Sequence, residues 1–361
     1  MRITQIDTVT LDEFPNLLFI EIHRDAGFTG LGETFFGAPE VATFIVAGLA
    51  LAGLAWIVSF STEALGERFG PGLTGILQST LGNLPEFFVV LFALNAGEIL
   101  VAQTSLIGSL LANGLLVLGL TIIVGARASE GGVMRFHARL PNDTMTLLML
   151  AVFVIVILGV ANSSNDAASA HAEAISAIGA VCLLIVYAAW LASYLRADTA
   201  AAPTRAHEPV VALGVSIGLL AAAGVGAAFV SDWFIAALGP AIDSLGISRA
   251  FAGLVIVAIA GNAVENTTAL VLAAKRQNDL AISVIKNSVS QIAVFLFPAL
   301  ILVSLLFAHS LTFVLPPVYI ASLALSAIAI WQITGDGEAR AYEGAALVAL
   351  FVIVAAVAWF E

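Results

Sequence analysis

The sequence has few cysteines, few charges and no cluster of basic residues, and each shortage excludes a class of protein. The single cysteine among 361 residues, Cys182, cannot form an intrachain disulfide and belongs to no redox motif. Lysine and arginine number 13 against 25 aspartate and glutamate residues, and no basic patch indicates a nucleic-acid partner. Charged residues make up 11% of the chain, well below the roughly 25% of soluble domains. The composition therefore excludes an ordinary soluble domain.

Long hydrophobic runs fill the chain from about residue 41 onward. Hydrophobic residues make up 60% of the sequence, and most runs approach the roughly 20 residues that a helix needs to cross a bilayer. We predict an all-α membrane protein with ten transmembrane helices, over residues 41–60, 72–94, 99–124, 144–160, 173–195, 210–238, 248–274, 280–308, 316–334 and 342–360. The short connections leave almost nothing for a soluble domain after residue 41.

Residues 1–40 differ from the rest of the chain because apolar and polar side chains alternate there. The alternation predicts short strands over residues 1–11, 16–24 and about 28–33. Three short strands bury too little surface to fold alone, so we expect this strand-like N-terminal arm to need a partner. No signal-peptide pattern precedes the first hydrophobic run.

The N-terminal arm resembles the opening of the capping domain in the mandelate racemase/muconate lactonizing enzyme branch of the enolase superfamily. The resemblance rests on residues 1–4, 20–27 and 30–34. Catalysis in that family takes place on a barrel, and no barrel strands are predicted after residue 40. We therefore carry over no activity and interpret the arm as a fusion scar or a mis-joined start.

Two short strings place a carboxylate inside corresponding membrane-length helices. They read Gly82-Asn83-Leu84-Pro85-Glu86 and Gly261-Asn262-Ala263-Val264-Glu265, and the spacing between the two copies stays constant, without a gap, as far as Ser109 and Ser288. An ionisable group in hydrocarbon is costly, so it indicates an ion or proton site by default. Its occurrence in two related segments predicts a transporter built from two repeats with the site between them.

The distribution of Lys and Arg predicts the topology. Nine fall on one side of the ten spans, namely Arg68, Arg127, Arg135, Arg139, Arg196, Arg205, Lys275, Arg276 and Arg340, and three on the other, namely Arg2, Arg24 and Arg249. The first side should be cytoplasmic, with both termini extracytoplasmic. Five spans per half is an odd number, so the second half must be inverted relative to the first. We predict an arm at 1–40, a first transmembrane repeat at 41–195, a linker at 196–209 and a second repeat at 210–361.

The two glutamates suit a divalent cation that exchanges with protons. A hard cation such as calcium prefers several oxygen ligands, including carboxylates. Asn83 and Asn262 precede Glu86 and Glu265 by three residues, near the same helical face. Removal from water and mutual repulsion both favour protons on the two carboxyl groups, whereas a bound cation favours the ionised pair. Protons and the cation would then compete for one site, which gives antiport if the site alternates its exposure.

Residues beside the glutamates favour broken helices. Gly82 and Gly261 allow neighbouring backbone to pass closely, and Pro85 removes a backbone donor. Broken helices at mid-membrane free carbonyl oxygens that can serve as further ligands.

The next helix of each repeat supplies further candidate ligands. Ser109 and Ser288 occupy equivalent places, with Asn113 and Gln291 nearby. Hydroxyl and amide groups can bind the ion or donate to the carboxylates, although small polar residues also join membrane helices by ordinary hydrogen bonds.

Lys286 places a positive charge two residues before Ser288. We expect its stem to snorkel toward the cytoplasmic interface. The alternative is a tethered charge beside the glutamate pair, which would oppose divalent binding and alter the stoichiometry.

These motifs resemble the cation/proton exchanger family of the calcium/cation antiporter superfamily over about residues 41–361. The resemblance rests on the two Gly-Asn-x-x-Glu motifs and on residues 61–65, 70–72, 105–119, 291–295 and 336–338. It implies calcium export driven by proton entry, with Glu86 and Glu265 as shared ligands and alternating access by sliding of the first and sixth spans. It implies no cofactor and a bacterial inner (plasma) membrane location, with calcium, protons and lipid as the only partners and the oligomeric state open.

Two positions depart from the family pattern. Asn266 stands where a His usually follows the second glutamate, and Lys286 precedes a stretch that usually reads Gly-Ser-Ser. A sodium-coupled or other-cation exchanger and a transport-inactive homologue therefore stay open as alternatives. An enzyme fragment of the enolase superfamily is the least favoured.

Overall fold

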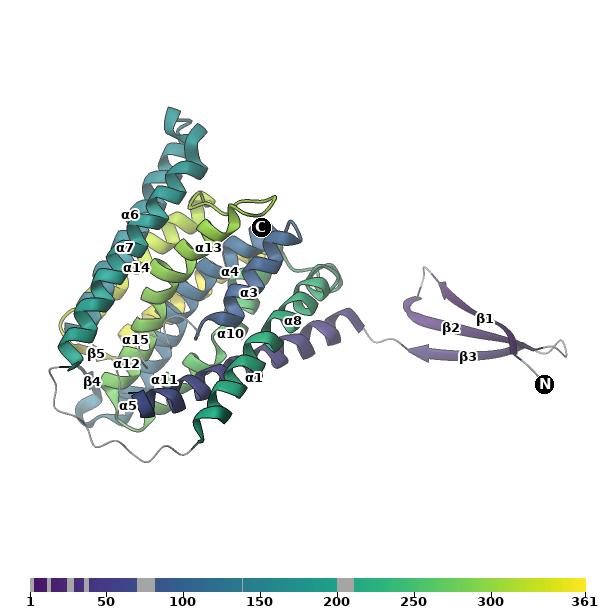
Figure 1. Cartoon of the computed structure of the whole chain (residues 1–361), viewed down its shortest axis with the longest axis horizontal. Helices are drawn as coiled ribbons and strands as arrows, with labels where there is room; N and C mark the ends of the chain where they lie inside the picture. The colour runs from purple at the N-terminus through teal and green to yellow at the C-terminus, as the bar shows by residue number, and fades with distance from the viewer. Residues whose placement is uncertain are drawn as a thin grey trace.

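The computed structural model describes residues 3–11, 14–24, 29–35, 39–69, 82–137, 139–199 and 211–361. The first part of the predicted span at 72–94 and most of the predicted linker at 196–209 lie outside these residues. The described chain after residue 39 is mostly helical, and its helices gather into one bundle (Figure 1).

The first half of the bundle begins with the long helix α1 (Pro39–Phe69) and the short helix α3 (Leu84–Asn95). Helix α4 (Ile99–Leu111) continues through the π-helical turn η1 (Ala112–Val117) into α5 (Leu118–Ala128). A 3-10 turn η2 (Glu130–Gly132) and strand β4 (Val133–Arg135) lead to a helical hairpin, α6 (Arg139–Ser163) and α7 (Ala172–Thr199), which are joined by η3 (Ala167–His171). This hairpin runs along one edge of the bundle (Figure 1).

The second half begins with α8 (Leu213–Leu245). A broken helix follows, made of α9 (Arg249–Phe251), η4 (Ala252–Val257), α10 (Ala258–Gly261) and α11 (Ala263–Ala274). Helix α12 (Asn278–Gln291) continues through η5 (Ile292–Leu296) into α13 (Phe297–Ser304). Helix α14 (Pro317–Thr334), strand β5 (Glu338–Arg340) and helix α15 (Ala341–Trp359) complete the chain.

Eight helices of the described residues are long and apolar enough to cross a membrane, and a ninth span results if the pieces of the broken helix on either side of its 61° bend count as one. Helix α3 is shorter, with 12 residues. The chain is therefore a largely helical protein with eight or nine candidate spans. The predicted total of ten would further require α3 to be part of a span that starts before residue 82.

The repeated motif produces the same local structure twice. Helices α3 and α11 have the same length, and their starts are separated by the same offset as the two motif copies. Helices α4 and α12 also begin at positions related by this offset, and each runs into a π-helical turn at its C-terminal end. Equivalent sequence therefore gives equivalent helix starts and equivalent irregular turns.

Glycines allow helices from different halves to touch along their backbones. A Cβ atom at Gly108 of α4 would lie 2.3 Å from the carbonyl oxygen of Leu254 in η4, and one at Gly253 would lie 2.1 Å from the hydroxyl oxygen of Thr104. Gly119 of α5 likewise approaches α15 closely. Small residues let membrane helices approach closely, and here they hold the two halves in van der Waals contact.

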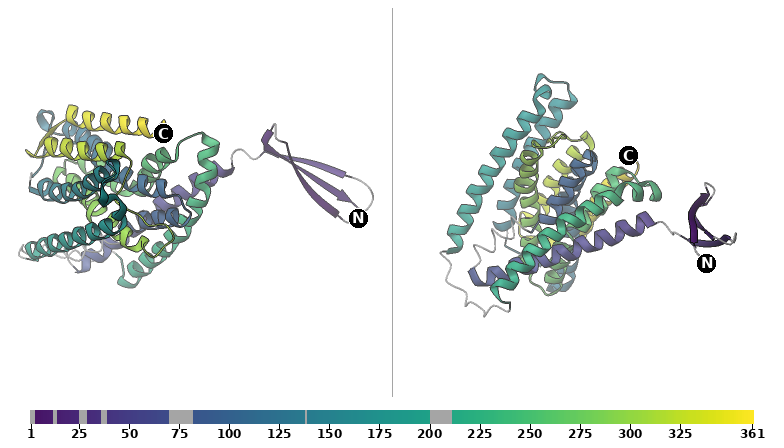
Figure 2. Two further views of the ribbon diagram at one scale, coloured as in Figure 1. Left: turned by 90° about the horizontal axis from the view of Figure 1, so that it is seen from above. Right: turned by 45° about the vertical axis from the view of Figure 1, so that its right-hand side comes forward.

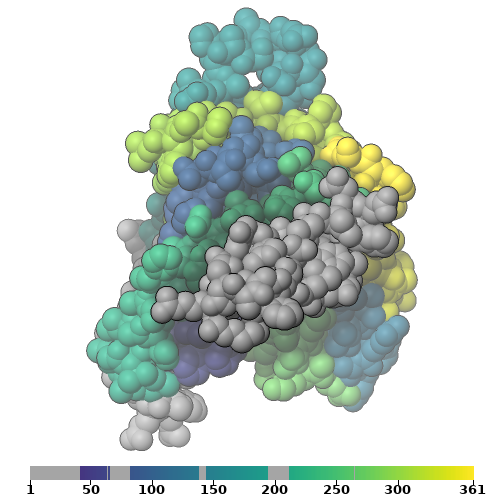
Figure 3. All heavy atoms as spheres, turned by 90° about the vertical axis from the view of Figure 1, so that its right-hand side faces the viewer, coloured from purple at the N-terminus to yellow at the C-terminus, as the bar shows by residue number. Residues whose placement is uncertain are grey.

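Helices α1 and α8 lie side by side and cross the bundle obliquely in each view (Figures 1 and 2). Part of α8 forms the molecular surface (Figure 3, green at the left). Phe229 and Trp233 of this helix are exposed. Apolar side chains on the outer face of a transmembrane helix suit contact with lipid.

Two small sheets complete the described structure. Strands β1 (Ile3–Leu11), β2 (Phe14–Arg24) and β3 (Thr29–Phe35) form an antiparallel sheet, with Ile6 opposite Ile22 and Ile20 opposite Gly32. Strands β4 and β5 pair antiparallel and so connect a loop of the first half to a loop of the second.

Candidate functional site

Both glutamates of the repeated motif lie in the first turn of a helix. Asn83 is the N-cap residue of α3 and Asn262 that of α11, with similar backbone angles of φ −93°, ψ 17° and φ −107°, ψ 19°. Neither asparagine side chain caps its own helix. The helix N-terminus carries partial positive charge, which favours an anionic side chain at Glu86 and Glu265. The two asparagine side chains are available for other partners.

A chain of hydrogen bonds joins the two motif copies. The Ser109 hydroxyl donates to a carboxylate oxygen of Glu86. The side-chain amide of Asn262 donates to the Ser109 hydroxyl oxygen at 2.9 Å. The amide of Asn113 donates to the Oδ1 atom of Asn262 at 2.9 Å and to the hydroxyl oxygen of Ser288 at 3.0 Å. Five predicted site residues, contributed by both halves of the chain, therefore form one buried polar cluster.

Three side-chain atoms of predicted ligand residues have no hydrogen-bond partner among the described residues. They are the second carboxylate oxygen of Glu86, the Nδ2 atom of Asn83 and the Oδ1 atom of Asn113. The side chains of Glu86, Asn83 and Asn113 are all buried. A buried polar atom without a partner is destabilising, so it usually marks a place where water or a ligand binds. Two of these three atoms are oxygens, as a hard cation requires.

Glu265 lies near this cluster and has a different environment from Glu86. Its charge acts on the Glu86 carboxylate, so the two acidic groups are within electrostatic reach. Glu265 as a whole residue is partly exposed, whereas Glu86 is 4% exposed, although the carboxyl group of each lies inside the protein. Its carboxylate accepts no hydrogen bond from another side chain in the part of the chain that the structure describes.

A small cavity of about 10 Å³ lies beside Glu86, close to the least volume that a single water molecule needs. Pro85 and Gly261 line it from α3 and α10. A Cβ atom at Gly261 would stand 4.0 Å from that of Glu86, so the broken helix passes directly beside the glutamate. Two of the three helix-breaking residues that the sequence singles out, Pro85 and Gly261, therefore lie beside the acidic group.

Gln291 and Asn266 lie outside the hydrogen-bond chain. Gln291 is the last residue of α12 and is partly buried. Asn266 follows Glu265 directly, and its Oδ1 atom is buried without a partner within the described residues. The hydrogen-bond chain thus joins five of the eight predicted ligands and leaves out Gln291, Glu265 and Asn83. Asn266, which was not a predicted ligand, also lies outside it.

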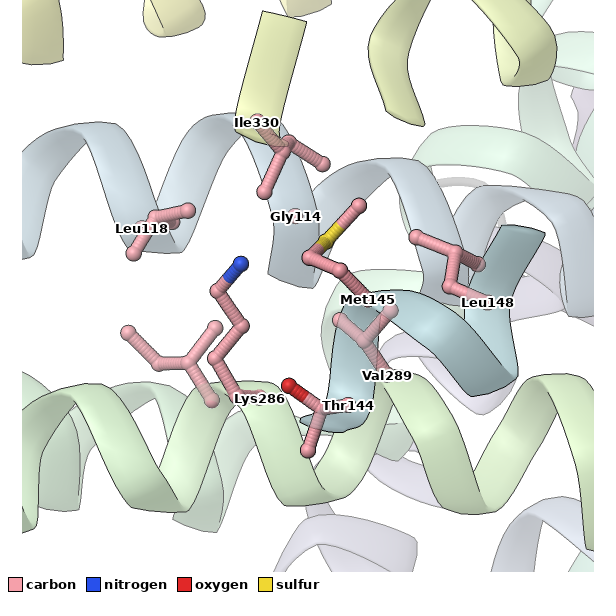
Figure 4. Close-up of a pocket in the computed structure, with 9 residues that line it drawn as sticks. Gly114, Leu118, Thr144, Met145, Leu148, Lys286, Val289 and Ile330 are labelled. Carbon is pink, nitrogen blue, oxygen red and sulfur yellow. The ribbon is translucent and has the colours of Figure 1, made fainter. Parts of the chain in front are cut away.

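The snorkelling orientation expected for Lys286 is wrong. The side chain is 2% exposed and its Nζ atom donates to the Thr334 hydroxyl at 3.0 Å, inside the protein. It projects into a small cavity beside Gly114 and Thr144 (Figure 4). The residue turns inward because α6 and the α4–α5 helix cover this face of α12, so that the stem has no path to the interface.

Polar contacts at the ends of the helices have no counterpart among the sequence-based predictions. His137 contacts Asp279 of α12 through its backbone N at 2.7 Å and its ring Nδ1 at 3.0 Å. Arg249 of α9 pairs with Glu98, next to α4, at 3.0 Å. Residues that lie far apart in sequence without a shared motif leave no signal of such pairing, so only the folded chain reveals it.

Comparisons with known proteins identify the family. The family model described as "Sodium/calcium exchanger protein" matches residues 40–195 and 215–360. The chain is 31% identical to a vacuolar calcium ion transporter of Schizosaccharomyces pombe, over 96% of this chain and 85% of that protein. It is 30% identical to a Ca(2+)/H(+) antiporter of Synechocystis, over 96% of each chain.

Solved structures of related exchangers have a similar fold. Native YfkE superimposes with a TM-score of 0.76 at 28% identity and covers 90% of this chain and 93% of its own. The structure titled H+/Ca2+ exchanger CAX gives a TM-score of 0.72 over 89% of this chain and 86% of its own, and its 16% identity supports the fold alone. The family model begins at residue 40, and these comparisons give no support to the enolase-superfamily resemblance of residues 1–40. The chain belongs to the sodium/calcium exchanger family, whose members are membrane transporters and not enzymes.

Proposed function

We propose that this protein is an antiporter that exchanges Ca²⁺ for protons across a membrane. The observation that carries the proposal is the buried hydrogen-bond chain from Glu86 to Ser288, which joins side chains of both motif copies. Its relatives include proteins named Ca(2+)/H(+) antiporter from Synechocystis and from Bacillus subtilis, the latter 30% identical over 88% of this chain. Family membership and the polar cluster support the same activity.

Glu86 and Glu265 form the shared cation and proton site in this proposal. Two ionised carboxylates neutralise one Ca²⁺, and two protonated carboxyl groups are neutral without it. The site therefore has no net charge, whether it holds calcium or two protons. It can change its exposure from one side of the membrane to the other without the desolvation energy of a buried charge. One Ca²⁺ then exchanges for two protons, and the two substrates cannot occupy the site together.

Neutral oxygens complete the cation shell. Asn83, Asn262, Ser109, Ser288 and Asn113 supply amide and hydroxyl groups within the cluster, and Gln291 is the candidate at its edge. No group of three or more His, Cys, Asp or Glu side chains suited to a metal is found among the described residues. A site with two carboxylates and neutral oxygens holds calcium less tightly than one rich in carboxylates, which suits an ion that must be released.

The proposed architecture consists of two inverted five-helix repeats, at residues 41–195 and 210–361, joined by a linker at 196–209. The family model matches the chain in two stretches that follow this division. The bias of Lys and Arg supports cytoplasmic loops after α1, α5, α7, α11 and α14, with both termini extracytoplasmic. We place the protein in a bacterial plasma membrane, where proton entry would drive calcium export.

Calcium uptake by inside-out membrane vesicles tests the proposal. An acidic lumen should drive uptake of calcium in the wild type, and acidifying the calcium side should inhibit uptake competitively. Glu86→Gln and Glu265→Gln should each reduce uptake by about 100-fold or more, because each leaves the buried divalent cation with one charged ligand in place of two. Glu98→Gln, which changes an acid at a helix end, is the matched control. Full uptake in both glutamine variants would reject the shared site.

A related exchanger of another cation is the second candidate, because some matched proteins are named only as cation/proton exchangers, such as one from Oryza sativa. The same vesicles assayed with manganese, sodium and potassium distinguish these cases. Transport of a monovalent ion in preference to calcium would favour the alternative, and no transport of any ion would identify an inactive homologue.

A further inference from the structure

The small cavity beside Glu86 has an apolar wall on the side of α1 and α8. Leu51 of α1 and Phe234 of α8 line it opposite the broken helix, and Glu86 is its one ionisable lining residue. Leu51 is 3% exposed and Phe234 1% exposed, so neither side chain leaves a path for water. Any route from this face to Glu86 must therefore pass these two side chains.

Phe234 is held in place by a second ring. It stacks on Phe44 of α1 with ring centroids 4.6 Å apart and ring planes 24° apart. A Cβ atom at Gly48 would lie 3.4 Å from the Phe234 ring, so the ring packs against the backbone of α1 between Phe44 and Leu51. Positions 44, 48 and 51 share one face of a helix, so they form one continuous contact surface for Phe234.

The ring pair lies on a defined side of the cavity. Phe44 is seven residues, or about 10 Å, nearer the start of α1 than the lining residue Leu51. In the topology proposed above, α1 starts and α8 ends on the extracytoplasmic side. The stacked rings therefore stand between Glu86 and the extracytoplasmic solution, whereas Glu265, in the second motif copy, is partly exposed.

We propose that Phe234, stacked on Phe44, is the seal that closes extracytoplasmic access to Glu86. The inference rests on the proposed antiport, since a seal matters only if the glutamate takes ions from alternate sides. A buried aromatic pair excludes water from the path. Helices α1 and α8 pack extensively on each other, so a joint shift of the two against α3 would carry the ring pair away and wet Glu86. The seal thereby couples the position of two helices to the exposure of one carboxylate.

Thiol labelling from the extracytoplasmic side tests this inference without relying on transport. In a Cys182→Ala background, Val89→Cys places a thiol in the wall of the cavity. A membrane-impermeant maleimide should label it slowly. Adding Phe234→Ala should raise the labelling rate by about tenfold or more, because a space of ring size opens in the seal. Phe229→Ala, a change of the same kind at an exposed position of α8, should leave the rate unchanged.

A labelling rate that Phe234→Ala does not change would overturn the inference. If that variant does not fold, Phe234→Leu removes the ring stack but keeps most of the volume. Phe234→Leu should raise the labelling rate a few-fold. A rate equal to that of the Cys182→Ala/Val89→Cys protein would also overturn the inference. Calcium uptake by the wild type tests the proposed function, and the labelling rate tests the seal. Failure of one can therefore be distinguished from failure of the other.

Discussion

The two copies of Gly-Asn-x-x-Glu have the same backbone but different surroundings. Glu86 is buried and accepts a hydrogen bond from Ser109, whereas Glu265 is partly exposed. The asparagines show the opposite pattern, because Asn262 bonds to Ser109 and Asn113 while the amide nitrogen of Asn83 has no partner among the described residues. The asparagine of the second copy is thus connected, through Ser109, to the glutamate of the first.

In the inverted-repeat antiporter proposed above, this difference would correspond to one of two related states. In an inverted-repeat transporter the two halves exchange conformations when the site changes side. Glu265 would then become the buried glutamate with Ser288 as its donor, and Asn83 would take the bridging position. Variants that affect one copy more than the other test this comparison.

The largest difference is expected between the two asparagines. Asn262→Ala removes hydrogen bonds to Ser109, to Asn113 and to the Ala258 carbonyl, so it should lower the free energy of unfolding by about 3 kcal/mol. Asn83→Ala should lower it by about 1 kcal/mol or less. Thermal unfolding in detergent measures both. Equal losses would mean that the two copies are equivalent in the calcium-free protein.

A steric difference follows at the helix crossing of the first copy. Gly108→Ala would place a methyl group against the Leu254 backbone, so we expect a loss of about 2 kcal/mol of unfolding free energy. The equivalent position of the second copy is Asn287, which shows that this close crossing belongs to one copy only. Gly53→Ala, which meets nothing within 4 Å, is the control and should stabilise α1 by about 0.5 kcal/mol. If both variants behave alike, the crossing is not tightly packed.

Lys286 breaks the symmetry through charge, because the equivalent residue of the first copy is Ile107. Lys286→Met removes a positive charge two residues from Ser288 and should tighten calcium binding about fivefold, or about 1 kcal/mol. Thr334→Val removes the hydrogen-bond acceptor of Lys286 but keeps the lysine, so it is the matched control. Isothermal titration with calcium measures the change, and unchanged affinity in Lys286→Met would show that the lysine does not act on the site.

The smallest effect is expected at the exposed contact between His137 and Asp279. Exposed ion pairs contribute little, so His137→Gln should change the free energy of unfolding by about 0.5 kcal/mol or less. Asp279→Asn should behave in the same way. A loss above that of Gly108→Ala would mean that this loop holds α12 in place.

The sequence predicted the membrane class, the repeat and most of the polar cluster, because these depend on local pattern. Hydrophobic run length indicates the helices, and the constant offset between the motif copies places equivalent side chains on equivalent helices. Ser288 could be nominated because it occupies the place equivalent to Ser109 in the next helix of its repeat, and Asn113 because it lies near Ser109. That they meet each other and Asn262 is a property of the fold.

What the sequence did not predict depends on which face of a helix is covered. Lys286 lies near the predicted start of its span, which favours snorkelling, yet packing with other helices turns it inward to Thr334. The pairing of β4 with β5 joins loops from opposite halves of the chain, and strands this short have no periodicity to detect. The Phe44–Phe234 stack likewise has no motif, since aromatic residues are common throughout apolar helices.

The π-helical turns η1 and η5 have a consequence for the geometry of the cluster. Each wide turn accommodates one residue more than an α-turn, in the helix that carries Ser109 or Ser288. Tightening such a turn would rotate the serine-bearing half of the helix by about 100° against its other half. The orientation of each hydroxyl group around its helix therefore depends on a single inserted residue. A one-residue deletion within residues 114–117 would turn Ser109 away from Glu86 while every side chain in the cluster stayed chemically intact.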